Sequence, residues 1–561
     1  MGHHELKQAP PAALHEIDGS SQENLDDINL ARIGKRAVLR AWFGLEEFWV
    51  DVNPGLQLHD SHHLGGYNSV CYCLHTFLLS QFVVANTRYH DRLFIQGFQN
   101  GGPAGSVYAF LFVWAGVTAT FVVLSELVSM APTAGGQYHW CSMLVPPSAM
   151  KLSSYITGWL TVIGWQATYA TAIYLNGTYI AAMISLTHSD YVPQAWHMTL
   201  YSYATALIGL AINCVGGKLL PRFEGTILIL HILGFFAILI PLTYMAEHKS
   251  AKEVFTHFIN EGQWPTQGLS FFVGLIGPVF AFAGGDAAVH MAEEISNAPT
   301  YVPWSLMLTV LINGTLGFAM LLALLFCLGD IDTALNDPTG LPFVGIFLQA
   351  TESIPGTVVM ASIIIVLCFC TSVGMLASAS RQFWSFSRDR GIPGWQLWSQ
   401  VTTRTAIPTY TVVFTTTISL LLNLINIGSD VAFNSLVSMS TSGLYLSYMV
   451  VAGLLLYRRC TGGIMERNNG SRGSEIKINT AGAQLVWGPF HVRGVLGIAL
   501  NVFSLIYMTI ATFFSFWPPN NHADVQSMNY SVVGTVGTII LSLLYYFVRA
   551  RRIYSGPVVE I

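Results

Sequence analysis

Long runs of apolar residues recur along most of the 561-residue chain, and no other feature constrains its fold as strongly. A helix that crosses the hydrocarbon core of a bilayer needs about 20 consecutive apolar residues. Eleven runs approach or exceed that length. They are 105–130, 153–184, 197–216, 223–245, 269–290, 303–328, 356–386, 408–427, 431–457, 494–517 and 529–549. Apolar character on all sides at these lengths favours membrane spans over buried helices of a soluble protein.

The composition supports the same conclusion. Hydrophobic residues make up 52% of the chain and charged residues only 10%, whereas a soluble protein carries about 25% charged residues. The net charge of -5 gives no indication of a nucleic-acid partner. The eight cysteines form no CxxC pair, so neither a disulfide framework nor a zinc site is predicted. Because no nucleophile constellation, phosphate-binding loop or metal cluster is recognisable, we expect no enzyme and no cofactor.

The lysines and arginines predict the orientation of the chain. A weaker apolar run, 67–86, precedes the other eleven and is interrupted by polar residues. If all twelve cross the membrane and the N-terminus is cytoplasmic, 21 of the 25 lysines and arginines lie on the cytoplasmic side. Positive residues concentrate on that side of membrane proteins. The sequence therefore predicts twelve spans, with both termini in the cytoplasm and a helical core over 95–550 between tails at 1–44 and 551–561.

The run 269–290 contains the strongest functional signal. Pro278 removes a backbone hydrogen bond, and the Gly284-Gly285 pair tolerates an unwound backbone. A broken helix in lipid requires that its freed backbone groups meet protein or line a cavity, and in secondary transporters such breaks form the solute site. Asp286, an acid inside the membrane, is a functional candidate for the same reason. The alternative is a kink for helix packing, with Asp286 capping the second half-helix.

Several charged residues lie near the end of this run and near the end of 356–386, or just beyond them. His290, Glu293 and Glu294 are candidates for helix capping, gating ion pairs or proton movement. The string HMAEE lacks the second histidine of a zinc-protease motif, which argues against a metalloprotease. Arg381 and Arg388 are candidate gating partners, and the alternative is that they only anchor the helix on the positive side of the membrane.

Three further spans carry candidate residues. Glu126 lies near the end of 105–130 and needs a partner, for which an arginine such as Arg388 is a candidate. Glu224 and His231 are seven residues apart and share one helix face. Because a free histidine titrates near neutrality, His231 is a candidate for proton coupling, although a hydrogen bond to a neighbouring helix explains it equally well.

Trp165 and Gln166 lie in the middle of 153–184. An aromatic ring at that depth can cover a cationic head group, so both residues are candidates for the solute site. The alternative for Trp165 is packing between helices.

Several sequence strings together resemble one family, and they occur in its order over roughly 95–550. They are GGPAG at 101–105, APTAGGQYHW at 131–140, LPRFEG at 220–225, FAFAGGDAAVHMAEE at 280–294 and SRQFWSFSRDRGIP at 380–393. The chain resembles the fungal amino acid/choline (GABA-type) permease branch of the amino acid–polyamine–organocation superfamily.

The resemblance implies a fold of two inverted five-helix repeats, spans 1–5 and 6–10, with two helices appended. Broken spans 1 and 6 hold the substrate in that fold. It also implies import of an amino acid, γ-aminobutyrate, a polyamine or choline, coupled to a proton or another cation, with the plasma membrane as the expected location. By position, the substrate-binding residues of span 6 are Phe280, Phe282, Ala283, Gly284, Gly285 and Asp286.

The segment 45–94 departs from the resemblance. Span 1 of that family carries a short motif of small residues around its break, and this segment shows none but holds five of the chain's 17 histidines. Our hypothesis is a faulty gene model here, such as a translated intron or a shifted frame, which intact mature transcripts would exclude. Two alternatives to a working transporter therefore stay open, a nutrient sensor without net transport and an inactive product.

Overall fold

The structure, a computed structural model, describes a large part of the chain. The described residues are 30–35, 93–215, 220–330, 339–403, 405–428, 432–467, 478–524 and 528–558, with side chains excepted at 93–95, 220–224 and 432. The predicted weak span 67–86 and nearly all of the atypical segment 45–94 lie outside the described residues.

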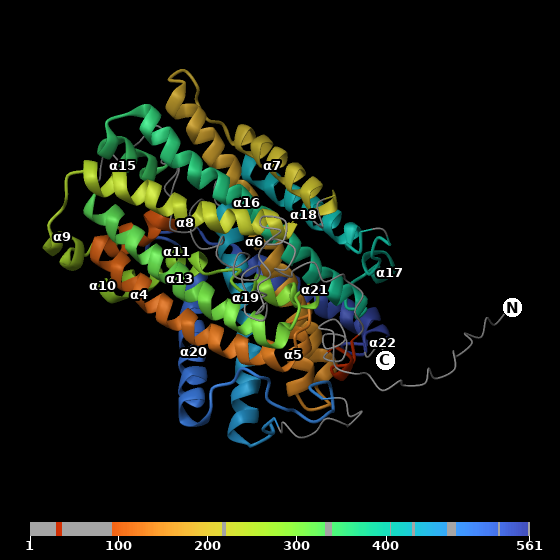
Figure 1. Ribbon diagram of the computed structural model, residues 1–561. Helices are drawn as coiled ribbons and strands as arrows, with labels where there is room; N and C mark the ends of the chain where they lie inside the picture. The colour runs from red at the N-terminus through yellow and green to blue at the C-terminus, as the bar shows by residue number, and fades with distance from the viewer. Residues whose placement is uncertain are drawn as a thin grey trace, which may run out of the picture.

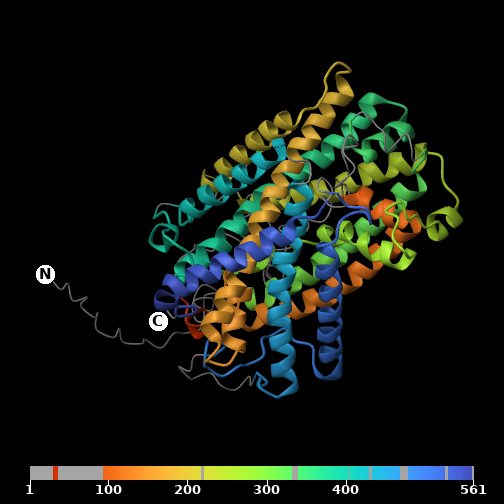
Figure 2. The same cartoon turned by 180° about the vertical axis from the view of Figure 1, so that it is seen from behind.

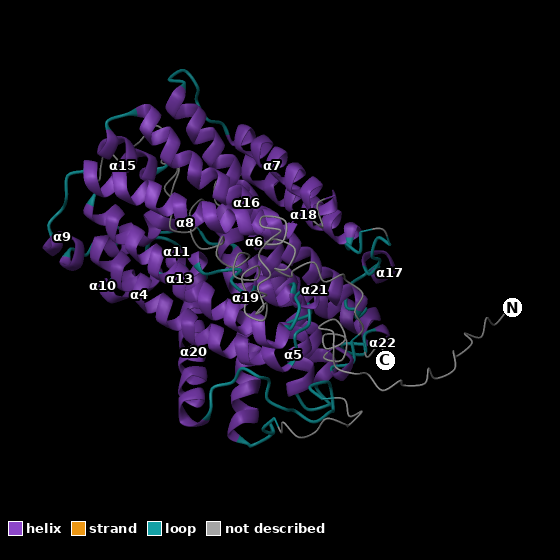
Figure 3. Cartoon of the chain, viewed as in Figure 1, coloured by secondary structure: helices purple, strands orange, loops and turns teal. Residues whose placement is uncertain are grey.

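The described residues form helices joined by loops, with no strand among them (Figure 3). The elements, with labels as in Figure 1, are α4 (Leu93–Met130), α5 (Gln137–Leu144), α6 (Met150–Thr187), α7 (Ala195–Val215), α8 (Leu220–Met245), α9 (Ala251–Thr256), α10 (Gln267–Val273), α11 (Ile276–Ala281), α12 (Ala287–His290), η2 (Ala292–Glu294), α13 (Ala298–Phe326), α15 (Pro342–Thr351), α16 (Ile354–Arg388), α17 (Trp395–Trp398), α18 (Thr409–Gly428), α19 (Ala432–Cys460), α20 (Gly494–Ser515), α21 (Ser531–Tyr545), η3 (Tyr546–Ala550) and α22 (Arg551–Ile553).

Each of the eleven clear predicted spans coincides with helix in the structure. Among the described helices, nine are long and apolar enough to cross a bilayer. The other two predicted spans are α6, which has 38 residues, and the interrupted segment that contains α10, α11 and α12. The chain is therefore an all-α polytopic membrane protein, as predicted, while the count of twelve spans stays a prediction.

Proline and serine mark the starts of several helices. Pro342 opens α15, and Pro355 lies in the first turn of α16. Proline is tolerated there because an N–H in the first turn of a helix has no hydrogen-bond partner within that helix. The Ser353 hydroxyl caps α16 by accepting a hydrogen bond from the Gly356 N–H at 3.3 Å. Such caps satisfy backbone donors that the helix leaves unpaired.

The contacts between helices stay similar when each span of the first predicted repeat, spans 1–5, is exchanged for its counterpart in the second, spans 6–10. α4 packs on α13, α6 on α16, and α7 on α18, so that spans 2, 3 and 4 each meet their counterparts 7, 8 and 9. α6 also packs on α19, and its counterpart α16 packs on α8. Two structurally related halves produce this exchange. The packing therefore agrees with the two repeats that the resemblance implies.

The appended helices lie on the outside of this arrangement. α20 packs on α4 and α19, and α21 packs on α6 and α19. Seen from behind, α19 and α20 stand side by side and extend beyond the other helices at one end of the bundle (Figure 2).

The two described ends of the chain meet at one buried carboxylate, Asp389, after the end of α16. Its Oδ1 accepts from Lys35 Nζ at 2.8 Å and from the Val558 N–H at 2.9 Å, and its Oδ2 accepts from the Tyr138 hydroxyl at 2.7 Å. Burial alone would raise the pKa of Asp389, but the cations of Lys35 and Arg388 hold the pKa below its ordinary value. We call this side of the bundle the predicted inner end.

Two glycines let α6 and α19 touch through their backbones. A Cβ added at Gly443 would lie 2.8 Å from the Gly164 nitrogen and 2.9 Å from its Cα. A Cβ at Gly164 would lie 2.8 Å from the Leu444 nitrogen. Small residues at such crossings allow the close packing that holds helices together in lipid.

We predict that Gly443→Ala destabilises the protein, because overpacking costs about 1–3 kcal/mol. Gly453→Ala on the same helix is the matched control, since a Cβ there meets nothing within 4 Å. Both variants replace glycine by alanine and therefore raise the helix propensity by the same amount. The midpoint of thermal unfolding in detergent should fall by several degrees for the first variant only. Equal midpoints for the two variants would contradict the close approach of α6 and α19.

Candidate functional site

The predicted break in the sixth span is present in the structure. α11 ends at Ala281, α12 begins at Ala287, and the residues between them form turns. The break uses Gly284 at a φ of 77°, a left-handed conformation that glycine adopts without a steric penalty. Its freed backbone groups are partly satisfied locally, since the Ala287 N–H donates to the Gly284 carbonyl at 3.1 Å. The sequence therefore predicted both the place of the break and the residue that permits it.

Asp286 lies in this break and is fully buried. Its Oδ2 accepts a hydrogen bond from Gln137 Nε2 at 2.7 Å and faces His290 Nε2 at 3.3 Å. Its Oδ1 has no hydrogen-bond partner among the described residues. Asp286 occupies the N-cap position of α12, but its side chain makes no capping bond. The structure therefore does not support the alternative in which the Asp286 side chain caps α12.

His290 connects the break to two other elements. Its Nδ1 lies 2.9 Å from the Ala134 carbonyl oxygen, in the turn between α4 and α5. Its ring meets the ring of Trp165 on α6 edge to face, with the two ring centroids 5.4 Å apart and an interplanar angle of 89°. The structure thus brings Trp165 to the broken segment. It places the neighbouring Gln166 against α18, where Nε2 donates to Thr415 Oγ1 at 3.1 Å.

The remaining predicted site residues are also buried, in the break or at the end of α11 just before it. Phe280, Ala283 and Gly285 are shielded from solvent, and the ring of Phe282 lies 5.8 Å from that of Phe110 on α4. A Cβ added at Gly285 would lie 2.2 Å from Phe121 Cζ. α4 therefore covers one side of the break, and the absence of a side chain at Gly285 makes room for it.

Two buried ion pairs join the segment after the break to α16. Arg388 donates to both carboxylate oxygens of Glu293 at 2.9 Å, and its guanidinium lies 4.5 Å from the ring centre of Trp384. Arg381 Nε donates to Glu294 Oε1 at 2.9 Å. Both arginine side chains are at most 9% exposed. These arginines therefore pair with acids inside the protein instead of serving only as surface anchors.

The suggested pairing of Glu126 with Arg388 is wrong. Glu126 forms a buried ion pair with Arg459 at the end of α19, and its Oε1 accepts from the Val492 N–H at 2.7 Å. The Arg459 guanidinium also lies 5.0 Å from the ring centre of Trp487. Glu126 thus fastens the end of α4 to α19 and the loop that follows it. Arg388 is already engaged by Glu293.

The two predicted residues on α8 lie apart from this cluster. His231 is buried, with 1% of its surface exposed, on a helix that packs against α13, α15 and α16. The side chain of Glu224 lies outside the described residues.

Sequence reasoning missed Gln137 as a partner of Asp286. It belongs to the GGQY string, in which Gly136 has a φ of 51° and brings the first turn of α5 toward the break. A Cβ at Gly136 would lie 3.2 Å from Cε1 of His290. The two consecutive glycines before a polar residue are the only signal that could have indicated this contact.

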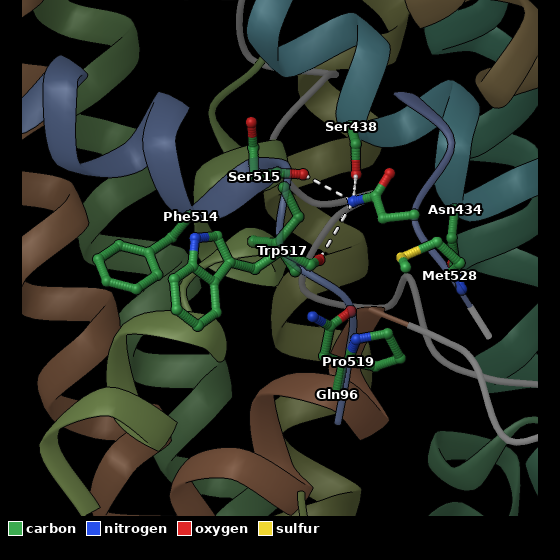
Figure 4. Close-up of a pocket in the computed structure, with 10 residues that line it drawn as sticks. Gln96, Asn434, Ser438, Phe514, Ser515, Trp517, Pro519 and Met528 are labelled. Carbon is green, nitrogen blue, oxygen red and sulfur yellow. Dashed lines mark hydrogen bonds between the residues drawn. The ribbon is translucent and has the colours of Figure 1, made fainter. Parts of the chain in front are cut away.

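A cavity lined by residues of α4, α11, α19 and α20 and of the loop after α20 is shown in Figure 4. Its lining residues are Gln96, Ile276, Asn434, Ser438, Phe514, Ser515, Trp517, Pro519, Met528 and Asn529. The Asn529 amide donates to the Ser515 carbonyl at 2.8 Å, the Trp517 carbonyl at 3.2 Å and Ser438 Oγ at 3.1 Å. The side chain of Asn529 therefore ties α21 to α19 and α20. Across the described residues, no group of three His, Cys, Asp or Glu side chains is placed to hold a metal ion.

The chain matches known proteins over most of its length. A family model described as "Amino acid permease" matches residues 76–538, beginning within the atypical segment 45–94. A choline transporter of Saccharomyces cerevisiae is 30% identical over 82% of this chain and 77% of its own length. Amino-acid permease BAT1 of Arabidopsis thaliana is 27% identical over 83% and 88%. Amino-acid permease 2 of Neurospora crassa is 24% identical over 82% and 81%.

We predict that Arg388→Gln lowers the free energy of unfolding by about 3–5 kcal/mol, because it leaves the Glu293 carboxylate buried without its partner. The matched control is Arg493→Gln, which breaks an exposed pair with Glu466 whose members are 76% and 59% exposed. An exposed pair contributes about 0–1 kcal/mol.

The measurement is the midpoint of thermal unfolding of the purified protein. Adding Glu293→Gln to Arg388→Gln should recover part of the loss, because the two residues are coupled. A Glu293→Gln/Arg388→Gln protein that is less stable than the sum of the single changes would contradict the pairing.

Proposed function

Since the chain belongs to the amino acid permease family, we propose that it imports a small amine-bearing solute by symport with a proton, through alternating access. Membership in this family makes the chain an integral membrane transporter of amino acids or organic cations and not an enzyme. The observation that carries the finer proposal is the broken sixth span with a buried acid in it. The solutes in question are amino acids, γ-aminobutyrate, polyamines and choline.

In this proposal, Asp286 receives the cationic end of the solute. Its Oδ1 has no partner among the described residues, although a buried carboxylate oxygen is costly to leave unpaired. A solute ammonium group would supply the missing donor or charge. The unwound backbone around Gly284 would offer carbonyl oxygens to the same group, as broken spans do in other transporters.

Aromatic side chains would complete the site around the solute. Trp165 lies against His290 beside the break, and its Nε1 has no hydrogen-bond partner among the described residues. Phe282 lies in the break itself. Rings near a cation attract it through their negative faces. This applies equally to a primary ammonium group and to the quaternary ammonium group of choline, so it does not select between them.

The ion pairs of Glu293 with Arg388 and of Glu294 with Arg381 would act as an inner gate. They join the broken span to α16 at the predicted inner end. Opening the site toward that side requires the two elements to separate, which means that the pairs must break. Alternating access would then consist of breaking these pairs after the solute has bound from the other side.

The proposed orientation of the chain in the membrane follows from the distribution of its lysines and arginines. With the lysine- and arginine-rich segments on the cytoplasmic side, both termini face the cytoplasm and the solute enters from outside. The proposed location is the plasma membrane, where a solute would be imported from outside the cell, and the proposed surrounding partner is the lipid bilayer.

The proposal predicts uptake of at least one labelled solute by a permease-deficient yeast that expresses the chain. Choline, γ-aminobutyrate and mixed amino acids are tested with and without a proton gradient. Two forms are compared, the chain as it stands and a version whose residues 45–94 are replaced by a family-like first span. Background uptake is measured in the same yeast without the chain.

Proton-dependent uptake by the unaltered chain would support the proposal and contradict a faulty gene model. Uptake only by the repaired form would support the family function and place the defect in 45–94. Solute binding without uptake by either form would contradict transport in favour of a sensor.

A further inference from the structure

Both main-chain groups of Ala134 are bound by residues that follow the break of the sixth span, in α12 and η2. Its N–H donates to Glu293 Oε1 at 3.0 Å, and its carbonyl oxygen lies 2.9 Å from His290 Nδ1. A carbonyl oxygen only accepts hydrogen bonds, so Nδ1 must carry a proton. The other ring nitrogen, Nε2, faces Asp286 Oδ2 at 3.3 Å.

A hydrogen bond between His290 and Asp286 would require one additional proton. A neutral imidazole with its proton on Nδ1 has only an acceptor at Nε2, and an ionised carboxylate is also only an acceptor. The two atoms attract each other only when a proton lies between them. Whether that proton is assigned to the ring or to the carboxyl group, the pair as a whole is uncharged. An uncharged pair suits a site in which both side chains are fully buried.

We infer that Asp286 and His290 together bind the transported proton, between Oδ2 and Nε2, and that its release loosens the inner gate through Ala134. This inference rests on the proposed symport. The proton arrives from the outer solution and departs to the inner solution, so no atom is oxidised or reduced. A solute ammonium at Oδ1 would favour the ionised carboxylate, which assigns the proton to His290 while the solute is bound.

Loss of the proton would disturb the gate for a geometric reason. Two acceptors then face each other, and His290 has to turn away or move its remaining proton to Nε2. Either change breaks its hydrogen bond to the Ala134 carbonyl. Because the Ala134 N–H binds the same Glu293 that Arg388 holds, movement of this turn disturbs the ion pair between the broken span and α16.

The surroundings of the pair contain few other groups that could hold this proton. From α5 the nearest contact is the uncharged Gln137, and from α6 it is the ring of Trp165. α5 also carries two buried titratable rings, Tyr138, whose hydroxyl donates to Asp389 Oδ2, and His139. The charged residues of η2 and α16 are engaged in two ion pairs, which join Glu293 to Arg388 and Glu294 to Arg381.

The first test needs no knowledge of the solute. Infrared difference spectra of the purified full-length protein are recorded between about pH 5 and about pH 8, where a histidine changes its charge. The wild type should show carboxyl and imidazole bands that disappear in Asp286→Asn and in His290→Gln. His231→Gln should keep them. Unchanged bands in Asp286→Asn, or their loss only in His231→Gln, would overturn the inference.

The second test separates coupling from transport. His290→Gln cannot titrate, and its amide can leave the Ala134 carbonyl without any change of protonation. The variant should therefore exchange labelled solute at equal pH on both sides of a vesicle. Its accumulation driven by a proton gradient should fall to the level reached without a gradient, whereas His231→Gln should accumulate solute like the wild type. Gradient-driven accumulation by His290→Gln at the wild-type level would contradict the inference and leave the proposed function intact. Absence of uptake by the wild type, with the infrared bands behaving as expected, would contradict the proposed function and leave the proton site intact.

Discussion

The structure depends on one constraint, which is that backbone polar groups inside a membrane have to be satisfied by protein. The sixth span violates regular helix geometry between Ala281 and Ala287, and it can do so only because other elements enclose it. α4 approaches through Phe121 and the missing side chain of Gly285. The turn before α5 approaches through Gly136. The packing of the first half of the chain around this break follows from that need.

Buried charge imposes the second set of contacts. Each of the acids Asp286, Glu293, Glu294, Glu126 and Asp389 is buried, and each meets a positive or titratable partner from a distant part of the chain or from the next helical turn. An unpaired charge in such surroundings is expensive. The ion pairs join two different sets of helices. The Glu126–Arg459 pair joins the ends of α4 and α19, whereas the pairs of Glu293 and Glu294 join the broken span to α16. In the proposed transport cycle, only the latter pairs lie across the boundary that has to open.

The sequence was sufficient for those features that depend on local chemistry. Span lengths follow from apolar runs, and the break follows from Pro278 and the Gly284-Gly285 pair. The sequence did not indicate which distant residue a given side chain contacts. Glu126 lies 333 residues from Arg459, and several arginines fitted it equally well until the packing of α4 and α19 was known. The opposite directions of Trp165 and Gln166 likewise depend on which helices flank α6.

The central claim is that a solute binds in the break of the sixth span and crosses the membrane from there. Its most direct test is a single cysteine in place of Ala283, in a protein whose native cysteines have been replaced, reacted with a cationic, membrane-impermeant thiol reagent. The account predicts labelling from the outside, and slower labelling when a transported solute is present. A labelling rate that no transported solute changes would contradict the placement of the site in this break.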